Sequence, residues 1–142
     1  MASMSASEWK AFLLDGSRTA KVATVSKDGR PMVVPVWFDL DGDEIVFETD
    51  DSSAKARNLE ANPHVAICVD DESFPFAFVS IRGRARLERL TASQLVPWTT
   101  RLSRRYVGDD RADEYGRRNA VEGAVLIRVS IDHVASMRDV AA

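Results

Sequence analysis

The chain has one cysteine and two histidines among its 142 residues, so it holds few of the side chains that bind transition metals or act as nucleophiles. Cys68 lies in an apolar run, where a thiol usually packs as a small hydrophobic side chain. His64 and His133 are far apart and lack the companions of a metal site, so we expect each to be structural or solvent-facing. We therefore predict no metal site.

Glycine is also scarce, and the seven glycines form neither of the common phosphate-binding loops. The chain contains no G-x-x-x-x-G-K-[ST] loop and no G-x-G-x-x-G turn, which excludes a P-loop and a Rossmann site. A Ser or Cys nucleophile would need a neighbouring base, and neither histidine stands in a recognisable setting for that role. If the protein is an enzyme, a bound cofactor must supply the chemistry.

Long apolar runs and a strong positive charge are missing as well. No run approaches the length of a membrane-spanning helix, and the first residues lack the basic and apolar regions of a signal peptide. The formal net charge of -3 gives no overall support for a nucleic-acid partner. We expect a cytoplasmic protein with a small-molecule substrate, without membrane or nucleic-acid partners, folded as a single domain over residues 1–142.

The hydrophobic pattern predicts a mainly β fold with peripheral helices. Apolar and polar residues alternate, or apolar residues run together, in segments typical of strands at 20–26, 31–38, 44–49, 64–69, 76–88 and 123–129. The first three are expected to form an antiparallel meander, and the nearly all-apolar fourth a central strand. Helices are predicted after Ser5, whose spacing to Glu8 is that of a capping box, around Lys55, along 95–106 and over 110–121. A closed or split barrel would leave few exposed strand edges.

The segment from Thr49 to Pro63 has the features of a phosphate-binding site. It leaves a strand, offers Ser52 as an N-cap, and places Lys55 and Arg57 in the first turns of a short helix. Cations are electrostatically misplaced at a helix N-terminus unless an anion lies among them. The alternative is that Ser52 only caps the helix and that the two cations are solvated.

Two other features admit both a binding and a purely structural interpretation. Pro35 cannot donate a ladder hydrogen bond, so it belongs at a sheet edge or a bulge, where its backbone either faces a flat ring or only blunts the edge. Arg82, Arg84 and Arg86 lie on one face of their strand, opposite Val79 and Ile81. They must pair with acids, reach solvent or share an anion.

The order of several short motifs resembles the pyridoxamine 5'-phosphate oxidase-like superfamily over about residues 8 to 136. Within it, the chain is most similar to the small actinobacterial flavin/deazaflavin oxidoreductases of the B group, many of which use coenzyme F420. The residues that carry the resemblance are Gly29-Arg30-Pro31, Pro35-Val36-Trp37-Phe38, the Ser52, Lys55, Arg57, Asn58 and Leu59 series, Gly83-Arg84-Ala85 and Arg105-Tyr106-Val107-Gly108.

This resemblance implies a six-stranded antiparallel split β-barrel of the FMN-binding type. It also implies a homodimer with cofactor sites at the interface, where the region from Arg104 to Tyr106 is the candidate for closing the partner's site. The implied cofactor is F420, with FMN as the alternative. The cofactor-binding residues that the resemblance implies are Pro35, Val36, Trp37, Thr49, Ser52, Ser53, Lys55, Arg57 and Asn58.

The implied reaction is hydride transfer from reduced deazaflavin to an electron-poor unsaturated small molecule. An FMN-dependent oxidoreductase of the same fold and a non-catalytic F420 or flavin carrier are the alternatives. The C-terminal substrate-binding residues of true pyridoxamine phosphate oxidases are not found here, so vitamin B6 oxidation is not expected. The sequence identifies no proton donor, and the arginines of 82–86 with Arg101 are the candidates for holding the anionic tail of F420.

Overall fold

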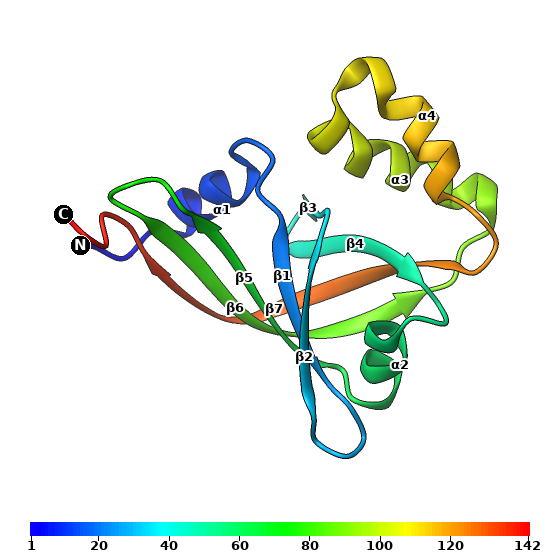
Figure 1. Ribbon diagram of the computed structural model, residues 1–142, viewed down its shortest axis with the longest axis horizontal. Coiled ribbons are helices and arrows are strands. Elements are labelled where there is room, and N and C mark those ends of the chain that lie inside the picture. The colour runs from blue at the N-terminus through cyan, green and yellow to red at the C-terminus, as the bar shows by residue number, and fades with distance from the viewer.

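The computed structural model describes all 142 residues and consists of one seven-stranded antiparallel sheet with four helices at its periphery (Figure 1). The helices are α1 (Ala6–Leu14), α2 (Ala54–Ala61), α3 (Ala92–Val107) and α4 (Asp109–Asn119). The strands are β1 (Ala20–Val25), β2 (Pro31–Val36), β3 (Asp39–Asp41), β4 (Glu44–Asp50), β5 (His64–Asp71), β6 (Ala77–Glu88) and β7 (Ala124–Met137).

The strand order is β2-β1-β5-β6-β7-β4-β3, so the predicted barrel is correct in class but differs in detail. The sheet has seven strands rather than six, because the strand predicted over 31–38 ends at Val36 and the short strand β3, which was not predicted, follows it. The predicted meander is wrong beyond its first hairpin, since β4 pairs with β3 and β7 instead of β2. β2 and β3 are therefore separate edges, and the sheet curves without closing.

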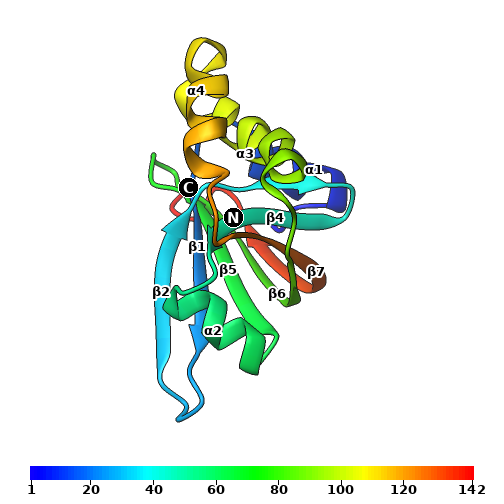
Figure 2. The same cartoon turned by 90° about the vertical axis from the view of Figure 1, so that its right-hand side faces the viewer.

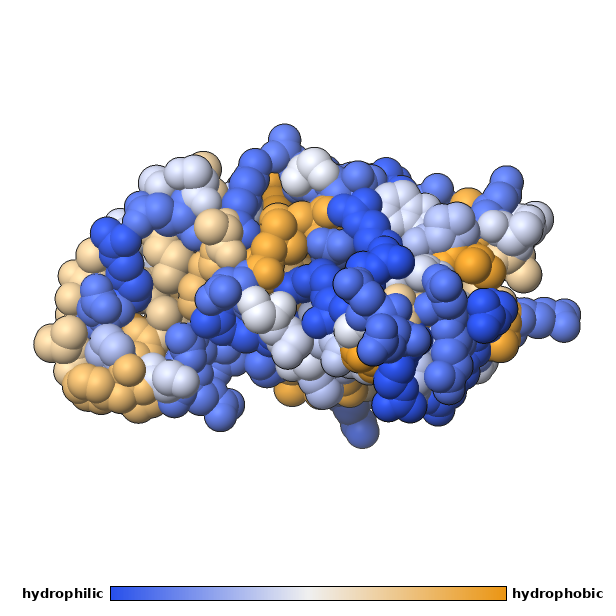
Figure 3. Space-filling view, turned by 90° about the horizontal axis from the view of Figure 1, so that it is seen from above, coloured by the Kyte–Doolittle hydropathy of each residue, from blue (hydrophilic) through white to orange (hydrophobic).

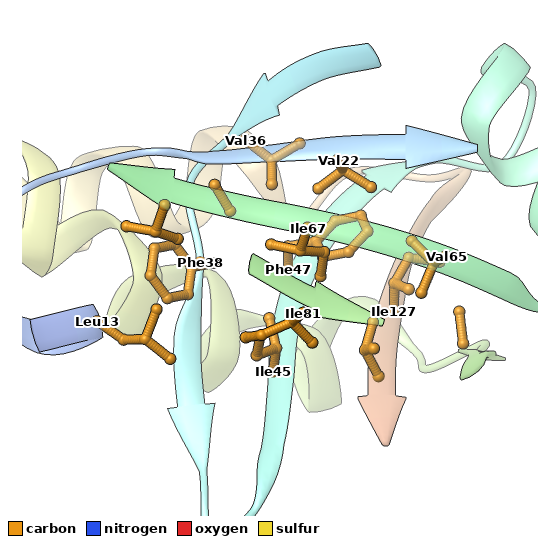
Figure 4. Close-up of a cluster of buried hydrophobic side chains, with 14 of the residues drawn as sticks. Leu13, Val22, Val36, Phe38, Ile45, Phe47, Val65, Ile67, Ile81 and Ile127 are labelled. Atoms are coloured by element: carbon orange, nitrogen blue, oxygen red, sulfur yellow. The ribbon is translucent and has the colours of Figure 1, made fainter. Parts of the chain in front are cut away.

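One face of the curved sheet encloses the hydrophobic core (Figure 4). Strand alternation in β6 buries Val79 and Ile81 and exposes Arg82, as the pattern predicted. Leu13 reaches the same core from α1, whose capping box between Ser5 and Glu8 is also confirmed. The largest side chains of this core that are fully buried are Phe38, Phe47, Leu13, Ile45, Leu59, Ile67, Ile81 and Ile127.

The predicted central strand, β5, lies inside the sheet between β1 and β6, but only one of its faces is buried. Val65, Ile67 and Val69 point into the core, whereas Ala66 is exposed and Cys68 is half-buried. The continuous apolar run was therefore a poor guide to burial, because small residues such as Ala and Cys occur on an exposed sheet face without a large apolar area. Burial still raises the pKa of the Cys68 thiol, which keeps it protonated.

The exposed arginines of β6 are mostly paired with acids. Arg84 forms a two-point contact with Asp132 at 3.2 Å, and Arg86 pairs with Glu44. Arg82 forms no ion pair within the chain and lies on the same exposed face. Carboxylates, and not a shared anion, thus compensate two of the three charges.

Helices α3 and α4 form a hairpin at one end of the molecule, beyond β3 and β4 (Figure 1). Arg101 fixes α3 to the sheet through Asp39 at 2.9 Å, so its predicted role toward a cofactor tail competes with a structural one. α4 packs closely on α3, because Gly116 has no side chain where Thr100 approaches. The segment predicted as a helix over 110–121 is confirmed as α4.

The surface differs between the two ends of the molecule. Viewed from above, hydrophilic residues predominate over the α3–α4 end, and hydrophobic residues gather near the chain termini (Figure 3). Met1 and Phe74 are among the large hydrophobic residues exposed there. None of the helices combines the length and the apolar composition needed to cross a membrane.

Candidate active site

A cleft of about 470 Å³ lies between the end of β2, the junction of β4 with α2, and the α3–α4 hairpin. Figure 2 shows α2 below and the hairpin above on the same side of the molecule, with β2 at the edge. The volume is within the usual range for small-molecule sites. Of the predicted cofactor-binding residues, those that line the cleft are Pro35, Val36, Trp37, Thr49, Ser53 and Lys55.

The start of α2 differs by one residue from the prediction. Ser53, and not Ser52, is the N-cap, since its Oγ accepts a hydrogen bond from the Ala56 N–H at 3.2 Å. Ser52 is held away by Asp50, whose Oδ1 accepts bonds from the Ser52 N–H at 2.8 Å and from its hydroxyl at 2.5 Å. The Ser53 and Thr49 hydroxyls are 3.1 Å apart, so two hydroxyl groups converge at this helix start.

Lys55 extends from the first turn of α2 into the cleft without an ion-pair partner. Burial lowers the pKa of its ammonium group, an effect that nearby Glu48 and Asp50 oppose. The first turn of α2 contains no acidic residue that would compensate the charge. A cation, two hydroxyls and a helix N-terminus together form a donor set suited to a phosphate group.

Arg57 and Asn58 lie on other sides of α2. Arg57 is exposed and borders a neighbouring groove together with Arg30, and Asn58 donates from Nδ2 to the Thr24 hydroxyl at 3.0 Å. Asn58 therefore holds α2 against β1. Contact of these two residues and of Ser52 with a cofactor stays a prediction, because none of the three lines the cleft.

Trp37 lines one side of the cleft and is supported by an aromatic stack. The Trp37 ring lies 5.2 Å from that of Tyr106 and is nearly parallel to it, at 4°. The Tyr106 hydroxyl accepts a bond from the Phe38 N–H at 3.1 Å and donates to the Arg18 carbonyl at 2.9 Å. Burial raises the pKa of Tyr106, so the hydroxyl stays protonated. Tyr106, which the sequence suggested for the partner's site, thus supports Trp37 of its own chain.

Pro35 lies on β2, an edge strand that pairs only with β1. Its missing N–H costs no ladder hydrogen bond on the open side, which confirms the predicted edge position. The end of β2, with Pro35 and Val36, and the following residue Trp37 line the cleft. The backbone of β2 is therefore free to lie against a flat ligand.

Sequence reasoning did not identify several residues of the cleft. Glu48 is half-buried on β4, and burial raises the pKa of its carboxyl group. α4 contributes Tyr115, Arg118 and Asn119, whose ring, charge and amide face the same space. The available signal for Glu48 was its position: this carboxylate directly follows the apolar run 45–47 within a predicted strand. For α4 there was none, because its position depends on packing against α3.

The model of the family described as "Pyridoxamine 5'-phosphate oxidase" matches residues 6–138. The chain belongs to this family. General stress protein 26 of Bacillus subtilis (strain 168) is 31% identical over 100 residues, which cover 69% of this chain and 71% of the relative.

Two solved structures have folds similar to that of this chain. A conserved hypothetical protein of Mycobacterium tuberculosis, Rv2991, is 26% identical with a TM-score of 0.82, covering 96% of this chain and 86% of its own. A protein named F420 reductase is 28% identical with a TM-score of 0.68, covering 87% of this chain and 93% of its own. The predicted split-barrel fold with peripheral helices is confirmed.

Proposed function

We propose that the protein is an F420-dependent oxidoreductase, which transfers a hydride from reduced deazaflavin to an electron-poor unsaturated small molecule. One observation carries this proposal. The same cleft contains Lys55, which has no ion-pair partner and lies at a helix start, and the end of the edge strand β2, which Trp37 follows. The 28% identity to an F420 reductase supports the choice of cofactor. F420 contributes the hydride when bound, and the chain contributes its binding and orientation.

Each part of the cleft has a binding role in this proposal. Lys55, Ser53 and Thr49 hold the phosphate of the cofactor, since they offer a charge and two hydroxyls at one point. The strand around Pro35 and Trp37 lies along the ring system and fixes its plane. Leu102 of α3 adds an apolar wall, which limits water at the ring.

An FMN-dependent oxidoreductase is the second candidate, because a phosphate-binding site beside a strand that can lie along a flat ring suits FMN as well as F420. A non-catalytic carrier of either cofactor is the third. Turnover separates the three, since only an enzyme accelerates oxidation of the reduced cofactor by a substrate. Binding without turnover supports the carrier.

We expect the purified protein to reoxidise enzymatically reduced F420 faster than a protein-free control when activated alkenes, quinones or tetrapyrroles are supplied. Absorbance of oxidised F420 measures the rate, and the same panel with reduced FMN should show little protein-dependent rate. Turnover with FMN alone would replace F420 by FMN in the proposal. Tight F420 binding without turnover on any acceptor would favour the carrier.

We also propose that the protein is a homodimer with cofactor sites at the interface. The face of the sheet opposite the core leaves Val25, Val33 and Ala66 exposed on three adjacent strands, an apolar surface that a second copy would cover. Light scattering at micromolar concentration should give twice the mass of the 142-residue chain. A monomer that binds its cofactor at full affinity would contradict the two-subunit site.

A further inference from the structure

Glu48 is a carboxyl group without a partner in a ligand-sized cleft. Glu48 lies on β4 next to Thr49 and is half-buried, and its carboxyl group makes no hydrogen bond or ion pair with any other residue. Asp50, the other acid of the cleft, is exposed and accepts two hydrogen bonds from Ser52. The fold thus provides hydrogen-bond partners for the carboxyl group of Asp50. The more buried carboxyl group, that of Glu48, is left able to bind a ligand.

The groups that face Glu48 determine how it responds to a ligand. α2 contributes Lys55, which attracts the carboxylate without forming an ion pair with it, and β4 contributes Asp50, which repels it. α4 adds Tyr115 and Arg118 at the same cleft. At the cleft, β2 and α3 contribute only uncharged residues: Pro35, Val36, Trp37, Thr99 and Leu102. β7 places Leu126 opposite Glu48, and Arg128, two residues further along the same face, is paired with Asp41 and Glu88.

Burial is the main cause that raises the pKa of Glu48, and it outweighs the attraction of Lys55. A bound phosphate would add a negative charge nearby and would engage Lys55, the one group that lowers this pKa. Both changes favour the protonated form. A protonated carboxyl group donates a hydrogen bond to an anionic or carbonyl oxygen, whereas a carboxylate repels it.

We propose that Glu48 takes up a proton from solvent when a phosphate-bearing cofactor enters the cleft, and that its O–H then donates a hydrogen bond to an oxygen of that ligand. This inference rests on the proposed function, because it requires the cleft to bind such a cofactor. It assigns Glu48 the role of a cofactor-binding residue that distinguishes ligands by their acceptor oxygens. It also couples cofactor affinity to pH.

Isothermal titration calorimetry with FMN and with F420, in two buffers of different ionisation enthalpy at one near-neutral pH, measures the protons taken up on binding. The wild-type protein should take up more protons than Glu48→Gln, by up to about one per site. Comparing the two proteins with the same ligand cancels protons released or bound by the ligand itself. Glu72→Gln is the matched control and should behave as the wild type, because Glu72 is exposed, makes no ion pair and lies outside the cleft.

Affinity should show the same coupling. Wild-type binding weakens by up to about tenfold per pH unit once Glu48 ionises in the free protein, and Glu48→Gln lacks this component. Equal proton uptake by wild type and Glu48→Gln would overturn the inference and leave the proposed function standing. Failure of the wild type to bind either cofactor would overturn both.

Thermal unfolding of the free protein supplies a second readout that needs no ligand. Because the pKa of Glu48 is raised in the folded state, its contribution to stability is full at acidic pH and is lost as pH rises through that pKa. Glu48→Gln should therefore raise Tm by a few degrees at neutral pH and have a much smaller effect at acidic pH. A lower Tm at neutral pH would show a stabilised carboxylate and would overturn the inference.

Discussion

Lys55→Ala is expected to weaken the binding of both FMN and F420 by roughly ten- to a hundred-fold, because a charge-assisted phosphate contact contributes roughly 1.5–3 kcal/mol. The fold should remain intact, since Lys55 makes no ion pair in the chain and burial already disfavours its charged form. Fluorescence or calorimetric titration of wild type and variant with each cofactor measures the change. A reduction in affinity of similar size for the two ligands would indicate that both place their phosphate at α2.

Lys27→Ala is the matched control for this experiment. Lys27 is exposed in the turn between β1 and β2 and makes no contact with an acid, so its removal changes the net charge equally. Its affinities should equal those of the wild type. If Lys55→Ala also bound both cofactors as tightly as the wild type, the start of α2 would be a cap without a ligand role.

Local patterns of the sequence predicted those features that depend on near neighbours. The two faces of β6 followed from strand alternation, and the capping box of Ser5 and Glu8 followed from spacing alone. The position of the α2 cap was missed by one residue, because Asp50 and the helix compete for adjacent serines. Such competition depends on backbone geometry that residue types do not determine.

Long-range pairing was the feature that sequence reasoning could not supply. β4 pairs with β7 across more than half of the chain, as in Thr49 opposite Val125, and no local signal distinguishes this from pairing with β2. The same pairing places Glu48 beneath the hairpin of α3 and α4. The predicted residues on β2 and α2 meet in the cleft, whereas Tyr115 and Arg118 became visible only with the packing of α4 on α3.

Gly116→Val is expected to displace α4 from α3 and to lower both stability and cofactor affinity. A Cβ atom at this position would lie 2.0 Å from the Thr100 Oγ1 and 2.8 Å from the Thr100 Cα, and a backbone atom cannot move aside as a side chain can. Overpacking of this kind costs about 1–3 kcal/mol, which exceeds the gain in helix propensity on replacing glycine. Tm should fall by about 4 °C for each kcal/mol lost.

The fall in affinity follows from the position of α4, because Tyr115 and Arg118 reach the cleft from this helix. Glu114→Val is the matched control, since Glu114 is exposed on the same helix and touches no partner; it should leave the affinity for FMN and F420 unchanged. Adding Thr100→Ala to Gly116→Val removes the nearest clashing atom and should restore part of the lost Tm. If Gly116→Val lowered Tm but bound both cofactors like the wild type, α4 would be a structural brace with no part in the site.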